Sequence, residues 1–146
     1  MMPSLIIIAA AAAAGAGTPP PMSNHVAVTN AWFRSLPANL PAGGYFDIQN
    51  TDSSRLAVLT SAASPACGML MLHQSEEKNG MGTMKDVQSV DVPPAGTVRF
   101  APGGYHLMCM NPTSAMKPGA SVPVTFKFRD TSIKTVTFAV KNAKGE

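Results

Sequence analysis

An alternation of apolar and polar residues near the C-terminus constrains the fold of this chain more than any other feature. Every second residue of 122–129 is apolar, and after a turn at Asp130-Thr131 the alternation resumes in 133–140. Successive side chains of a strand point to opposite faces of a sheet. The pattern therefore predicts two strands, each with one buried face and one wet face. The buried positions expected from it are Val122, Val124, Phe126, Phe128, Val136, Phe138 and Val140.

Three further segments have the composition of short strands, so the chain is expected to form an all-β domain. They are residues 26–33, 43–48 and 55–60. The 12 glycines and 13 prolines suit many strands joined by turns, and we expect about seven to nine strands in one sandwich or barrel. The 11 basic and 8 acidic residues give a net charge of +3 without a basic run, which argues against a nucleic acid partner.

The N-terminal segment has the character of a targeting sequence. Residues 1–17 are apolar, too short to span a bilayer comfortably, and end with Ala14-Gly15-Ala16 as a cleavage site. The Lys or Arg expected at the start of a signal peptide is missing from the segment. A retained membrane anchor is the alternative. We assign residues 1–22 to a signal peptide and Pro-rich linker, and residues 23–146 to one β-sandwich domain. After cleavage we expect an exported monomer without stable membrane insertion.

Methionine and histidine are concentrated in the second half of the chain. Seven of the ten methionines and two of the three histidines lie between Met69 and Met116. Methionine fills gaps in cores, but a core has no need of histidines among its methionines. Thioether sulfur with imidazole is instead a ligand set for a soft metal ion. The ligand candidates are His73, Met84, His106 and Met108.

Strand geometry allows these four residues to converge. His106 and Met108 are separated by one residue and share a face of a strand, while Cys109 points the other way. A polar connection over residues 74–83 is expected to form a long turn that brings Met84 back beside His73. Thioethers favour Cu(I), and no carboxylate is expected beside the four ligands. A blue-copper centre is disfavoured, because it requires a Cys thiolate at the metal and Cys109 points away.

The spacing of the four residues resembles a known signature. His73, Met84, His106 and Met108 form the pattern H-x10-M-x21-H-x-M, which is similar to that of the PCu(A)C periplasmic copper chaperones. The resemblance also covers a Pro-Pro-Ala-Gly turn at 93–96, the segment 102–106 and the segment 30–32. It implies a cupredoxin-like Greek-key β-sandwich that binds one Cu(I) per chain and is not an enzyme. It further implies delivery to the dinuclear copper site of cytochrome c oxidase subunit II, alongside a Sco-like protein, in a Gram-negative periplasm.

The two cysteines, Cys67 and Cys109, leave alternatives open. An even count in an exported protein suggests one disulfide, although strand parity places the two side chains on opposite faces unless the chain bends near Cys67. Two buried free thiols are the alternative. A redox role would make the protein a thiol–disulfide reductase that maintains the cysteines of a copper recipient. A periplasmic copper storage or resistance protein is a further alternative.

Other residues near the site have weaker assignments. Met71 and Met110 are candidate accessory ligands, since parity places them on the side of His106, and Met69 shares that side. Met81 is an accessory candidate without such placement. All of them are equally compatible with packing under a loop. Trp32 is expected in the core.

Overall fold

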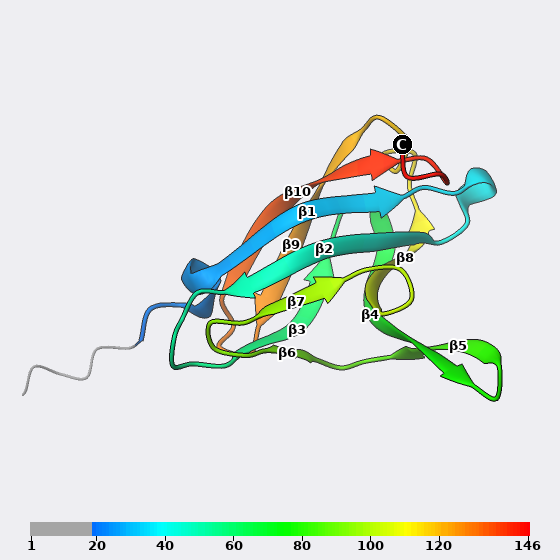
Figure 1. Ribbon diagram of the computed structural model, residues 1–146. Coiled ribbons are helices and arrows are strands. Elements are labelled where there is room, and N and C mark those ends of the chain that lie inside the picture. Colours follow the sequence, from blue (N-terminus) through cyan, green and yellow to red (C-terminus); the bar gives the residue numbers. More distant parts are fainter. Residues whose placement is uncertain (1–18) are drawn as a thin grey trace, which may run out of the picture.

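The structure is a computed structural model that describes residues 19–146, and its regular structure is almost entirely β-strand (Figure 1). Residues 1–18, which hold the predicted signal peptide, lie outside the described part of the chain. Among residues 19–146, no helix is long and apolar enough to cross a membrane. The elements are η1 (Met22–His25), β1 (Val26–Arg34), η2 (Pro37–Asn39), β2 (Ala42–Asn50), β3 (Ala57–Ala63), β4 (Cys67–Lys78), β5 (Met81–Asp86), β6 (Val90–Val92), β7 (Thr97–Phe100), β8 (Tyr105–Pro112), β9 (Ser121–Phe128) and β10 (Ile133–Lys141).

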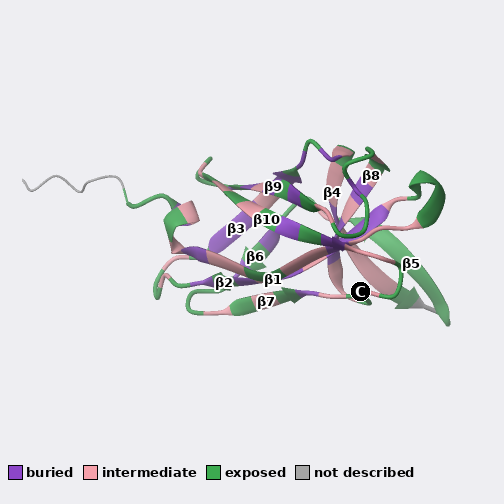
Figure 2. Ribbon diagram, turned by 90° about the horizontal axis from the view of Figure 1, so that it is seen from above, coloured by how far each residue is buried: buried purple, intermediate pink, exposed green. Residues whose placement is uncertain are grey.

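The strands form one continuous hydrogen-bonded sheet that closes around a core. Their order is β5-β4-β8-β2-β1-β10-β9-β3-β6, and β7 pairs with β2. β1 pairs in parallel with β10, the last strand of the chain, and antiparallel with β2. Strands that are neighbours in the sheet are thus often distant in sequence, as in a Greek key. Figures 1 and 2 show β1, β2 and β7 on one side of the core and β3 and β9 on the other. The predicted all-β, single-domain sandwich is confirmed.

Aromatic side chains from both sides of the sandwich fill the core. The ring of Phe46 on β2 lies 4.2 Å from that of Phe100 on β7 and 5.0 Å from that of Phe126 on β9. Six of the seven positions predicted from the C-terminal alternation are buried, and Val136 packs against them partly buried. The alternation therefore exists because β9 and β10 each turn one face to this core.

The predicted long turn over residues 74–83 is wrong. β4 and β5 extend toward each other until only Asn79-Gly80 separates them. Both residues have positive φ, 54° and 76°, as a two-residue type I′ turn requires, and Asn-Gly is the sequence that this turn prefers. The segment is polar because the β4–β5 hairpin lies at the edge of the sheet, where β5 is exposed along its whole length (Figure 2).

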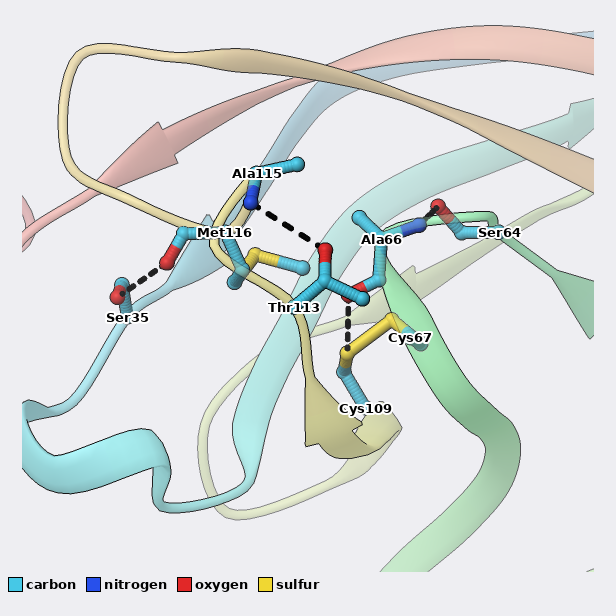
Figure 3. The surroundings of a disulfide bond; sticks show 8 residues. All are labelled: Ser35, Ser64, Ala66, Cys67, Cys109, Thr113, Ala115 and Met116. Atoms are coloured by element: carbon cyan, nitrogen blue, oxygen red, sulfur yellow. Dashed lines mark hydrogen bonds between the residues drawn. A yellow bond between two sulfur atoms is a disulfide. The ribbon is translucent and has the colours of Figure 1, made fainter.

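A disulfide ties β4 to β8 (Figure 3). It joins Cys67, the first residue of β4, to the fully buried Cys109, and the two Cα atoms are 5.3 Å apart. The chain turns at Pro65-Ala66 immediately before β4, and Asn111 has a φ of 49°, so β4 and β8 depart from straight strands at this end. These bends bring together two cysteines that parity alone would place on opposite faces.

Replacement of both cysteines by alanine is expected to lower the free energy of unfolding by about 4 kcal/mol, the loop-closure cost for cysteines 42 residues apart. Chemical denaturation of the oxidised protein and of the Cys67→Ala, Cys109→Ala variant measures this difference. Reductant should destabilise the wild type and leave the variant unchanged. Equal stability of the wild type with and without reductant would contradict the expectation.

Candidate metal centre

Three neighbouring strands bring the four predicted ligands to one face of the sheet. His73 on β4 lies directly opposite His106 on β8. Met84 on β5 lies opposite Ser75, which is two residues beyond His73 and therefore on the same face. Met108 follows His106 by two residues and shares that face as well. Residues that are far apart in the sequence thus meet on one surface at the edge of the sheet.

The residues between these ligands face the core, as parity predicts. Leu72 lies opposite Leu107 in the register of β4 and β8, and both side chains are buried. Cys109 is buried next to them. β8 also lies close to β2 at this point, since a Cβ atom added to Gly44 would come within 3.0 Å of the Leu107 Cβ and 2.6 Å of the Phe33 ring. Packing behind the sheet therefore holds the candidate ligands on its outer face in register.

His106 is the most buried of the four residues, at 3% exposure. Its Nδ1 lies 3.2 Å from the Gly104 carbonyl oxygen, which can only accept a hydrogen bond, so Nδ1 carries the proton. Nε2 is then left with a free lone pair, and it is buried without a hydrogen-bond partner. Burial lowers the pKa of His106, the hydrogen bond to Gly104 opposes this effect, and the neighbouring His73 adds to it. A neutral imidazole with one oriented lone pair is the form that binds a metal ion.

His73 lies edge-on to His106, with the two ring centroids 5.6 Å apart. Its Nε2 is 2.7 Å from Oδ1 of Asp86 on the neighbouring strand, but neither ring nitrogen has an aligned hydrogen bond. Buried polar atoms are normally satisfied, because an unpaired one costs about 1 to 3 kcal/mol. His73 Nδ1 and His106 Nε2 are therefore two unsatisfied ring nitrogens at one place, and a bound cation would satisfy them.

The four candidate ligands differ in exposure, and Met84 is the most accessible of them. Met84 is 61% exposed, and Met108 is partly buried. Of the accessory candidates, Met71 lies directly opposite Met108 on the same face. Met81 is exposed on β5, but it lies an odd number of residues from Met84 and so belongs to the other face. The site is thus buried at His106 and open at Met84.

Asp86 was missed by the sequence analysis, and the expectation that no carboxylate lies beside the ligands is wrong. Asp86 lies directly opposite His73 in the register of β4 and β5. It follows Met84 by two residues, so parity would have placed it on this face had the segment been recognised as a strand. A carboxylate next to a ligating histidine typically orients the ring and raises its basicity. Asp86 is placed to act in this way rather than as a ligand for a hard cation.

The donor set determines which ion fits. In residues 19–146, no group of three or more His, Cys, Asp or Glu side chains is arranged to hold a metal ion. Two imidazoles with two thioethers form a soft donor set that carries no net charge. Such a set matches a soft monovalent ion, for which Cu(I) is the biological example.

The fold is shared with solved structures of PCuAC domains. The protein resembles the structure described as the copper-bound PCuAC domain from PmoF2, with a TM-score of 0.67 and 20% identity over 81% of this chain and 93% of that chain. It also resembles the solution structure of CuI-DR1885 from Deinococcus radiodurans, with a TM-score of 0.63 and 26% identity over 88% of this chain and 83% of that chain. The expected resemblance to PCuAC domains is confirmed at the level of the fold.

Sequence comparison then gives the family itself. Residues 26–140 match the family described as putative lipoprotein LpqE-like, and the chain belongs to this family. A relative from Leifsonia xyli subsp. xyli (strain CTCB07), named putative lipoprotein Lxx21020, is 34% identical over 121 residues, which are 82% of this chain and 72% of the relative. Both descriptions refer to lipoproteins, which indicates a protein exported to the cell envelope.

The stability of the metal-free protein is expected to fall as the pH drops below about 6.5, the ordinary pKa of histidine. The folded state lowers the pKa of His106, so between the two pKa values the unfolded chain binds more protons. The contribution of neutral His106 to the free energy of unfolding is therefore complete above about pH 6.5. It is lost as the pH falls toward the lowered pKa of His106 in the folded protein. Urea midpoints measured in a chelator at pH 7.5 and 5.0 test this for the wild type and His106→Gln. The same pH dependence in both proteins would contradict it.

Proposed function

We propose that the protein is a non-enzymatic Cu(I) carrier of the bacterial periplasm. One ion is bound by His73, Met84, His106 and Met108, and the cargo is delivered to the dinuclear copper site of cytochrome c oxidase subunit II, alongside a Sco-like protein. The observation that carries this proposal is the pair of buried ring nitrogens without a hydrogen-bond partner, His73 Nδ1 and His106 Nε2, which lie on one face with the methionine thioethers.

Copper in the related structures supports the choice of ion. The PmoF2 domain is described as copper-bound and DR1885 as carrying Cu(I), and both have the fold of this chain. The oxidase as recipient rests on the resemblance of the motif to the PCu(A)C chaperones. The donor chemistry independently selects a soft monovalent ion.

The unequal exposure of the ligands suits a carrier. A chaperone releases its ion by ligand exchange, in which a ligand of the recipient replaces one ligand of the carrier at a time. Met84 is the most exposed of the four ligands and lies on the edge strand β5, so it is the first ligand that a recipient can displace. His106 is buried and held by Gly104, so it keeps the ion until the recipient has supplied its own ligands.

A thiol–disulfide reductase is less well supported than a carrier. Such an enzyme needs a sulfur atom that an attacking thiolate can reach. Cys109 is fully buried and bonded to Cys67, so only Cys67 is available to attack. Storage of copper uses the same binding site as a carrier, and it differs only in whether the ion is passed on.

The binding site is tested by anaerobic Cu(I) titration in competition with a chromophoric chelator. The wild type should retain one tight equivalent, and the His106→Ala, Met108→Ala variant should lose it to the chelator. Met81→Leu is the matched control, since Met81 is an exposed methionine on the other face of β5, and it should bind as the wild type does. Unchanged binding in the double variant would show that His106 and Met108 are not ligands of the ion.

The delivery step requires a separate measurement. The copper-loaded protein is mixed with the metal-free soluble domain of an oxidase subunit II, and the copper content of each is measured after separation. Transfer in minutes is expected for the wild type, with faster release from Met84→Leu because the exposed ligand is already missing. Copper that remains on the wild-type protein would favour storage over delivery while leaving the binding site itself intact.

A further inference from the structure

The row of side chains that contains the histidine pair continues along β4 and β8 with two pairs of methionines. Met71 lies directly opposite Met108, and Met69 lies directly opposite Met110. Residues two apart in a strand share a face, so these four thioethers lie on the same face as His73. The metal centre described above uses only Met108 of the four.

Core packing does not account for these methionines. In the same strands, the core is formed by the alternate residues, of which Leu72, Leu107 and Cys109 are buried. Met69 on the outer face is 57% exposed, and Met71 and Met110 are partly exposed. An outer sheet face normally carries polar side chains. Three accessible thioethers at successive positions of this face instead supply soft donor atoms.

The spacing separates the outer methionines from the histidine centre. Along a strand, four residues span about 13 Å, so one ion cannot contact both the Met69–Met110 pair and the His73–His106 pair. Directly opposed residues have Cβ atoms about 5 Å apart, and the flexible methionine side chain allows two opposed sulfurs to close on one ion. Met71 lies diagonally next to this pair and can supply a third sulfur.

We propose that Met69, Met71 and Met110 form a second soft-metal site, which binds Cu(I) or Ag(I) through thioether sulfur alone. Three neutral sulfur ligands suit a monovalent soft ion and offer nothing to a hard divalent one. Because the site has no imidazole, it binds more weakly than the histidine centre. The site itself is independent of the proposed carrier function, whereas its use as an entry position for the cargo rests on that function.

Ag(I), a redox-stable soft ion, is the probe for this site. The protein is labelled with [methyl-13C]methionine and titrated with Ag(I), and the methyl resonances are assigned by single Met→Leu substitutions. The resonances of Met69, Met71 and Met110 should shift with a second equivalent of silver, after those of Met84 and Met108 have shifted with the first. Methyl resonances of Met69 and Met110 that stay in place at excess silver would overturn the proposal.

Two variants keep the result interpretable. Met69→Leu, Met110→Leu conserves volume on an accessible face, so it should fold, lose the second equivalent and retain the first. His106→Ala, Met108→Ala should lose the first equivalent and retain the shifts of Met69 and Met110, which separates this proposal from the carrier proposal. Circular dichroism checks folding in each case, and Met81→Leu should bind both equivalents. Two equivalents in the Met69, Met110 variant would overturn the assignment.

Discussion

The pairing of β4 with β8 is the constraint on which the rest of the site depends. In the observed register His73 opposes His106 on the outer face while Leu72 opposes Leu107 toward the core. Because the side-chain period of a strand is two, a slip of one residue in either strand would exchange these faces for that strand. It would bury an imidazole in an apolar core and expose a leucine. The hydrophobic pattern behind the sheet therefore fixes the positions of the candidate ligands on its outer face.

The positions of the two histidines leave part of the hydrogen-bonding capacity of their rings unsatisfied. The Nδ1 of His73 and the Nε2 of His106 are buried without a hydrogen-bond partner, and burial lowers the pKa of His106. The same desolvation keeps this imidazole neutral, and the Gly104 carbonyl selects the tautomer in which Nε2 is free. The loss in hydrogen bonding and the readiness to bind a metal ion thus have one physical origin. A bound cation would take the place of the missing hydrogen bonds by accepting the free lone pairs of the ring nitrogens.

Side-chain parity made much of this arrangement predictable, because it depends only on local sequence. It placed His106 and Met108 outward and Cys109 inward, and it identified the buried positions of β9 and β10. It failed where a segment was not recognised as strand, as with Asp86. It also did not place Trp32, which was expected in the core. Trp32 lies half-buried on the outer face, where its ring contacts Tyr45. The side-chain cations of Arg34 and Lys141 lie over the same ring. Cation–π attraction stabilises an aromatic ring at such a position outside the core.

The position of each ligand within the sheet determines how firmly it is held. β8 is bonded on both sides, to β4 and β2, and is tied by the disulfide, so His106 and Met108 belong to its most constrained part. β5 is bonded on one side only and is exposed along its length, so Met84 and Asp86 can separate from the site at low cost. Opening of β5 would remove one thioether and the carboxylate that faces His73, and leave three ligands in place. A three-coordinate ion with an open side is the state from which soft ligands exchange, so the position of the site at the edge of the sheet agrees with the proposed carrier function.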